Sequence, residues 1–119
     1  MKSNKKFMYR SIALISVVLM VAVLYFFGRP VVANNYAEKA IDIYLEHKAE
    51  NNTQQFRIAL DYLEAARKWG RDDTNLGILK GQLLVGLGLK AEAIAQYELV
   101  KEKDTSAIAA VDELLKEIK

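Results

Sequence analysis

The residues that could support catalysis or bind a metal are few. The 119 residues include one histidine, His47, and no cysteine. The chain therefore has no disulfide, thiolate metal site or cysteine nucleophile, and a lone histidine provides no zinc-binding spacing. Carboxylates adjoin at Asp72-Asp73 and Asp112-Glu113, but neighbouring residues on a helix point in different directions. We expect no catalytic residue, no metal site and no cofactor, so the chain is not expected to be an enzyme.

Charge is divided unevenly along the sequence. The part after residue 33 has twelve Lys and Arg against fifteen Asp and Glu, a net charge of −3. The part before it has five basic residues and no acidic one: Lys2, Lys5, Lys6, Arg10 and Arg29. Because the basic excess belongs to the N-terminal part, the remainder lacks the footprint of a nucleic-acid-binding domain. We expect no nucleic-acid partner.

The apolar stretch 12–27 organises the chain, because it contains no charged residue and no proline. As a helix it would be about 25 Å long, and its apolar flanks extend it towards the roughly 30 Å hydrocarbon thickness of a bilayer. The pattern predicts a transmembrane helix over residues 11–28. The side chains that we assign to the membrane span are Ile12, Leu14, Val18, Leu19, Val21, Leu24 and Phe27.

The orientation of this helix follows from the flanking charge. Four basic residues lie in the first ten positions, and only Arg29 closely follows the apolar stretch. The positive-inside rule then leaves residues 1–10 as a cytoplasmic tail. We expect a single-pass protein of a bacterial inner membrane with its C-terminal domain in the periplasm or outside the cell.

Cleavage after Ala33 is the alternative, because Ala33 is a small residue before the cut and Val31 is tolerated two places earlier, after a basic N-terminal region. The apolar stretch is longer than the 7 to 15 residues usual in a signal peptide. We therefore favour retention of the segment.

The sequence Gly28-Arg29-Pro30 predicts that the first helix stops or kinks. Residues 29–35 are expected to be a linker and residues 36–119 a helical domain. Asn35 followed by Glu38 is a capping box, which predicts a new helix running to about Ala49. Its expected inward residues are Ala37, Ala40, Ile41, Tyr44 and Leu45.

Four more helices follow from similar signals. Asn52 with Gln55 predicts a helix that ends at Trp69-Gly70, with Trp69 packed over the turn onto the next helix. The next begins near Asp73 and ends at Gly86, a fourth covers residues 90–103, and Asp104, Thr105 or Ser106 caps the last. The expected inward residues are Phe56, Ala59, Leu60, Leu63, Ala66, Leu76, Leu79, Leu83, Leu84, Ala93, Ile94, Tyr97, Val100, Ile108, Val111, Leu114, Leu115 and Ile118. No stretch alternates with a period of two, so the fold is predicted to be all-α.

Two of these helices contain an internal repeat. Ala59, Leu63 and Ala66 match Ala93, Tyr97 and Val100 at an offset of 34 positions, which is the period of helix-turn-helix solenoids. At Gly81, Leu84, Gly88, Ala93, Tyr97 and Val100 the chain resembles the tetratricopeptide repeat family. It departs from the family at Gly77, Lys80 and Thr105, and Glu46, His47 and Glu50 depart from it in the preceding copy. A plain helical bundle is the alternative.

The resemblance implies a short tetratricopeptide-like array of about five helices that binds segments of other proteins in a concave groove. The groove positions carried over are Ile41, Tyr44, Lys48, Asn75, Ile78 and Gln82. The Lys and Asn clamp that some members use for a C-terminal carboxylate is not reproduced.

We therefore expect a membrane-anchored scaffold that holds or assembles partners of a membrane or envelope complex. Its partners would be other proteins and the lipid bilayer, and self-association stays open because an isolated helix pair is marginally stable. The alternatives are a structural accessory subunit held through its transmembrane helix and an assembly factor for exported proteins.

Overall fold

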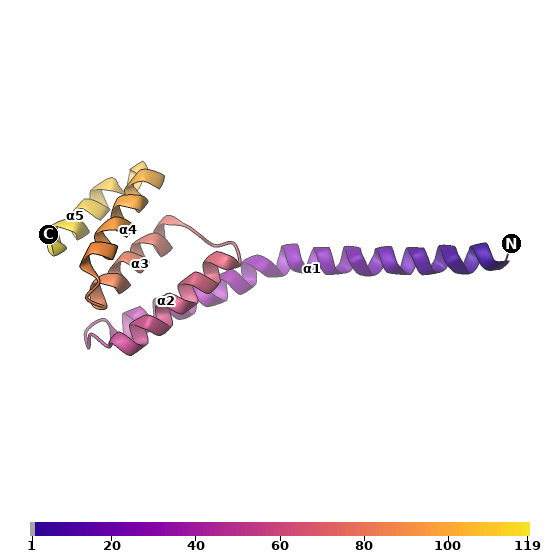
Figure 1. Ribbon diagram of the computed structural model, residues 1–119, viewed down its shortest axis with the longest axis horizontal. Helices are drawn as coiled ribbons and strands as arrows, with labels where there is room; N and C mark the ends of the chain where they lie inside the picture. The colour runs from indigo at the N-terminus through magenta and orange to yellow at the C-terminus, as the bar shows by residue number, and fades with distance from the viewer. Residues whose placement is uncertain (1) are drawn as a thin grey trace.

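The protein is all-helical, as the sequence predicts. The computed structural model describes the backbone of residues 2–119 and the side chains from residue 5 onward, so Met1 of the predicted tail lies outside the described residues. Within the described residues there are helices and turns but no strand: α1 (Lys2–His47), α2 (Thr53–Lys68), α3 (Thr74–Gly86), α4 (Lys90–Lys103), the 3-10 turn η1 (Thr105–Ala107) and α5 (Ile108–Ile118). The molecule measures 78 × 31 × 18 Å because the first half of α1 projects from the rest (Figure 1).

The longest element corrects one prediction. Residues 29–35 are not a linker, and Asn35 does not begin a helix, because α1 continues unbroken from Lys2 to His47. The two helices predicted on either side of Pro30 are therefore one, and it ends two residues earlier than expected. The fold has five α-helices over residues 2–119 where six were predicted.

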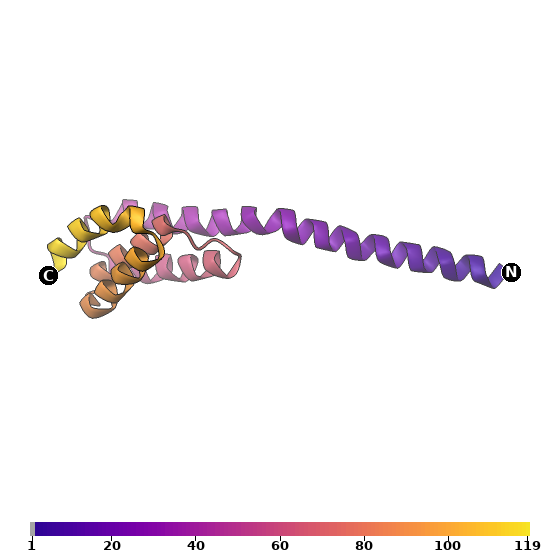
Figure 2. The ribbon, with the colours of Figure 1, turned by 90° about the horizontal axis from the view of Figure 1, so that it is seen from above.

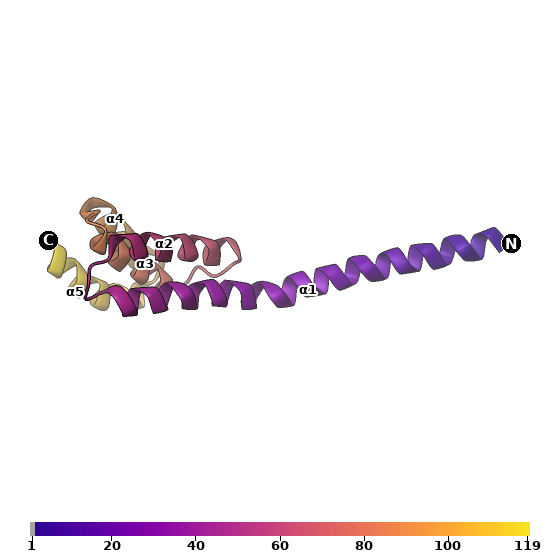
Figure 3. The same ribbon diagram turned by 90° about the horizontal axis from the view of Figure 1, so that it is seen from below.

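Pro30 bends α1 without ending it. Figures 2 and 3 show the helix changing direction between its projecting half and its packed half. A proline within a helix removes one backbone hydrogen bond, and its ring crowds the carbonyl four residues earlier. Together these effects cost about 3 kcal/mol. Contacts with the domain hold α1 on both sides of the proline. Before it, the Arg29 Nε donates to the Trp69 carbonyl at 3.0 Å, and after it Ala33 is buried.

The two parts of α1 have opposite surroundings. Residues 12–27, here called the apolar segment, have every side chain exposed except the half-buried Ala22. Residues 33–47, here called the packed segment, bury Ala33, Ala37 and Ala40 on one face. The helix is long and apolar enough to cross a membrane.

The packed segment and α2 form an antiparallel hairpin. Asn52 caps α2 as predicted, since its Oδ1 accepts from the Gln55 N–H at 3.2 Å. At the other end Gly70 has φ +102°, and the Arg71 N–H donates to the Ala66 carbonyl at 2.9 Å. This Schellman turn requires the left-handed conformation that glycine adopts at little cost.

A second hairpin consists of α3 and α4, with α5 packed against it. Asp73 caps α3 by accepting from the Leu76 N–H at 3.0 Å. Asp104, which follows α4, connects the end of α4 to the start of α3, because its carboxylate accepts from the Thr74 hydroxyl at 2.7 Å. The same carboxylate accepts from the Ser106 N–H at 3.0 Å. A Cβ on Gly81 would overlap the ring of Tyr97, so this glycine lets α3 and α4 approach closely.

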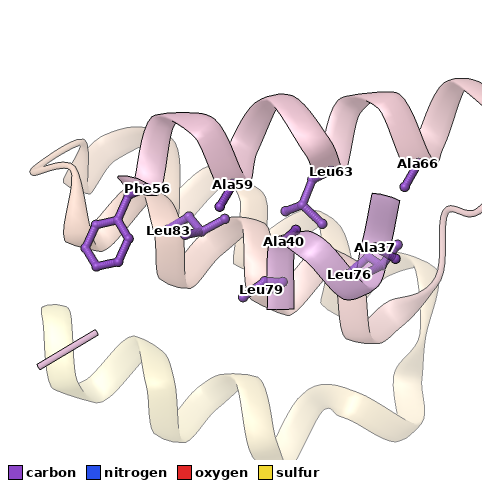
Figure 4. Close-up of a cluster of buried hydrophobic side chains, with 9 residues drawn as sticks. All are labelled: Ala37, Ala40, Phe56, Ala59, Leu63, Ala66, Leu76, Leu79 and Leu83. Carbon is purple, nitrogen blue, oxygen red and sulfur yellow. The ribbon is translucent and has the colours of Figure 1, made fainter. Parts of the chain in front are cut away.

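Two clusters of apolar side chains form the core. Figure 4 shows the first, which joins α1, α2 and α3 and consists of Ala37, Ala40, Phe56, Ala59, Leu63, Ala66, Leu76, Leu79 and Leu83. The second joins α4, η1 and α5 and consists of Tyr97, Val100, Ala107, Val111 and Leu115. The prediction that Leu45 and Ile108 face inward is wrong, because Leu45 is 55% exposed and Ile108 is 38% exposed.

Candidate protein-binding site

The packed segment and α3, which carry most of the predicted groove residues, are here called the inner layer of the domain. In Figures 2 and 3, α5 and the packed segment lie on one side, α2 and α4 lie on the other, and α3 lies between them. The six predicted groove residues come from the packed segment, the turn after it and α3. The inner layer therefore presents residues from helices that are far apart in the chain.

Three of the six support the core. Ile41 and Tyr44 are half-buried and pack against the first cluster, and the ring centroids of Tyr44 and Phe56 are 6.1 Å apart. Ile78 is half-buried against the second cluster. These side chains leave only part of their surface for a ligand.

The other three do not form one compact site with them. Asn75 and Lys48 are exposed and Gln82 is half-buried. The start of α3 lies beside residue 34 of α1, because the Arg71 Nη1 donates to the Asn34 Oδ1 at 3.3 Å. Lys48 follows fourteen residues later, about 21 Å along the helix axis. Lys48 and Asn75 therefore lie at opposite ends of the inner layer.

A group of side chains missed by the sequence analysis comes from α1, α4 and α5, and its members influence one another: Tyr44, Tyr97 and Glu117. Burial, followed by the negative charge of Glu117, raises the pKa of Tyr44. Burial, followed by the charges of Tyr44 and Glu117, raises the pKa of Tyr97 to about 12. The raised pKa values keep both phenols protonated further into the alkaline range than an ordinary tyrosine. No local pattern predicts this, since only the packing of α5 brings Glu117 near α1.

A cleft of about 320 Å³ lies between the hairpins. Leu63, Leu76 and Val100 contribute apolar surface, and charged side chains of α2, α3 and α4 line the same cleft. Several of the charges are paired across it or nearby: the Lys80 Nζ lies 3.2 Å from the Glu64 Oε1, and the Arg71 Nε lies 2.9 Å from the Asp73 Oδ2. The charges that line the cleft are thus partly balanced within the chain.

The sequence predicts that Trp69 packs over the turn onto the next helix. Instead, Trp69 lines a second cleft of about 350 Å³ with Phe26, Arg29 and Pro30 of α1. It remains 37% exposed. The tertiary contact between Arg29 and the Trp69 carbonyl directs the turn towards α1, and nothing near Trp69 in the sequence predicts that contact.

The described surface offers hydrogen bonds, ion pairs and apolar contacts. Among residues 5–119, no group of three His, Asp or Glu side chains gathers as it would around a metal ion. In the same part of the chain no polar residue is fully buried.

The chain matches no known protein-family model, no curated protein and no solved structure.

Proposed function

We propose that the protein is a membrane-anchored scaffold. In this proposal the apolar segment of α1 spans the bacterial inner membrane and the helical domain holds a partner of a membrane or envelope complex. The observation that carries the proposal is the continuity of α1, in which an exposed apolar segment passes directly into a segment packed in the domain core. A helix shared in this way fixes the domain close to the membrane.

A tetratricopeptide-like array is the arrangement that we propose for the domain. Its support is the 34-residue repeat, because Ala59 and Ala93 are both fully buried and the larger residues four positions later, Leu63 and Tyr97, are at most 5% exposed. Each triplet lies on the second helix of a hairpin, and α5 covers the last hairpin as a terminal cap would.

The binding surface that we propose is the inner layer. Restriction to a membrane raises the effective concentration of the domain towards other membrane proteins, so a modest groove would suffice. The basic residues before the apolar segment favour a cytoplasmic N-terminus and a periplasmic domain.

Photo-crosslinking in the native membrane tests this function. A photoreactive residue at Gln82 probes the inner layer, one at the exposed Glu92 probes α4, and one at Val18 probes the apolar segment. Quantitative mass spectrometry then identifies the adducts and their ratios. We expect a defined protein adduct from Gln82 and little from Glu92.

Other outcomes contradict this proposal in different ways. Adducts from Val18 alone, in fixed ratio with neighbouring membrane proteins, would make the protein an accessory subunit held through its transmembrane helix. A mature chain that begins at Asn34 would remove the anchor. Equal adducts from Gln82 and Glu92 would leave the inner layer without a special role.

A further inference from the structure

The end of α2 and the first residues of the turn after it, together residues 68–71, are the part of the folded domain that lies nearest to the apolar segment. Figures 1 and 3 show this turn beside α1 at the point where the projecting half begins. Two hydrogen bonds fix it there, from the Arg29 Nε to the Trp69 carbonyl at 3.0 Å and from the Arg71 Nη1 to the Asn34 Oδ1 at 3.3 Å.

The register of α1 places this turn at the level of lipid headgroups. The apolar segment ends at Phe27, and Arg29 follows two residues later, about 3 Å along the axis. The headgroup region on each side of the hydrocarbon core is about 5 to 7 Å thick. Because Trp69 lies in a cleft with Phe26 and Arg29, its side chain falls within that layer.

The residue type suits this position. Tryptophan is enriched at membrane–water interfaces, where its apolar ring and its N–H group find matching surroundings. Trp69 is 37% exposed and lies beside two side chains that continue the apolar surface of α1, Phe26 and Pro30. If Trp69 faced water, the exposed part of its apolar ring would contact solvent.

The charge of the same region is opposite to that of the domain. Residues 34–119 carry −3, whereas the turn and its surroundings have four basic residues against Asp72 and Asp73: Arg29, Arg67, Lys68 and Arg71. Asp73 caps α3 and pairs with Arg71, and Asp72 lies 3.9 Å from Arg67. These two pairs balance, so the net positive charge of the region comes from Arg29 and Lys68. Cations near a membrane surface are attracted to anionic phospholipids.

We propose that residues 68–71 form a second membrane contact, in which Trp69 lies in the headgroup layer and Arg29 and Lys68 face lipid phosphates. The inference rests on the proposed function, since it requires the apolar segment to span the bilayer. One helix alone leaves a domain free to tilt and rotate. The second contact holds one face of the domain against the membrane and directs the inner layer to a fixed orientation.

The chain offers a direct test because Trp69 is its only tryptophan. The full-length protein is reconstituted in vesicles of phosphatidylcholine and phosphatidylglycerol that carry a nitroxide either on the headgroup or deep in the acyl chain. We expect the headgroup nitroxide to quench Trp69 emission about twofold more than the deep one, as an interfacial position requires.

Two matched variants separate this contact from the anchor itself. Both carry Trp69→Phe, and each has one new tryptophan at an exposed position of α1. With Leu19→Trp, in the apolar segment, the deep nitroxide should quench more strongly. With Leu45→Trp, about 24 Å beyond Arg29 along the helix, neither nitroxide should quench.

The outcomes distinguish the two proposals. If Leu19→Trp is quenched by the deep nitroxide but the native Trp69 by neither, the anchor stands and the second contact is wrong. If Leu19→Trp escapes the deep nitroxide, the membrane-spanning function fails. If Trp69 is quenched equally in vesicles of phosphatidylcholine alone, the contact holds and the attraction of its cations to anionic lipid is overturned, because phosphatidylcholine has a phosphate but no net charge.

Discussion

The apolar and packed segments of α1 share one helix and one backbone geometry, yet they are built for different surroundings. The apolar segment has large apolar side chains on all sides, and nearly all of them are exposed. The packed segment has alanines on one face, with Ala37 and Ala40 fully buried against α2. Secondary structure alone therefore does not reveal where a helix resides.

The difference lies in how the apolar residues are distributed. A helix that is apolar all round requires an apolar environment on all sides. A helix with one stripe of small residues requires only a partner that can approach closely. If the apolar segment spans a membrane as proposed, the two segments should respond independently to substitution, and the following predictions test that independence.

The largest expected effect is in the packed segment. Ala40→Asp places an unpaired charge between α1 and α2, which should lower the free energy of unfolding by about 4 kcal/mol. Urea unfolding in detergent, followed by Trp69 fluorescence, measures the loss. Leu45→Asp, at a 55% exposed position of the same segment, is the control and should change stability by less than about 0.5 kcal/mol. Equal effects would mean that Ala40 is not in the core.

The second effect belongs to the apolar segment. Leu19→Arg should disfavour membrane insertion by about 3 kcal/mol while leaving the urea midpoint of the domain unchanged. Vesicle flotation measures insertion, and Leu45→Arg provides the matched control outside the segment. Unfolding of the domain by Leu19→Arg would break the comparison, because it would show that the segments fold as one unit.

A smaller effect tests whether the apolar segment unfolds together with the domain. Asn52→Ala removes the cap of α2, which should cost about 1 kcal/mol. The exposed neighbour Gln54→Ala should cost little. Far-UV circular dichroism of the unfolded Asn52→Ala variant in detergent should retain the helical signal of the apolar segment. Loss of that signal in the same transition would argue against independence.

The smallest expected effect is in acid. Although partial burial would raise the pKa of Asp73, hydrogen bonds from the Leu76 N–H and from Arg71 leave it below its ordinary value of 3.8. Its contribution to stability is complete above pH 3.8 and is lost as the pH falls through the lower native pKa. Asp73→Asn keeps a cap but cannot titrate, so its stability should fall less steeply in acid. Equal slopes for both proteins would contradict this assignment.

Much of the fold follows from local sequence signals. Asn52 and Asp73 predict the starts of α2 and α3, because their side chains satisfy backbone donors that the helix leaves free. Pro30 misleads, because its local cost is outweighed by contacts that residues 29 and 33 make with the domain. Such contacts connect residues forty positions apart and leave no local signature.

The candidate site is less predictable than the fold. The resemblance assigns Ile41, Tyr44 and Ile78 to a binding groove, but it cannot divide their surface between the core and a ligand. The approach of Glu117 to Tyr44 depends on how α5 packs, and the cleft beside Trp69 depends on how the α2–α3 turn meets α1. These features arise from tertiary packing alone.

The unbroken α1 also has a mechanical consequence. If the apolar segment spans a membrane as proposed, the helix from Pro30 to His47 would extend about 26 Å from the membrane surface and would act as a lever arm. A span tilt of about 20°, the average for membrane helices, would move the far end of the domain sideways by about 9 Å. Changes in bilayer thickness would thereby become displacements of the inner layer, and the contact at Trp69 would set how far the lever can swing.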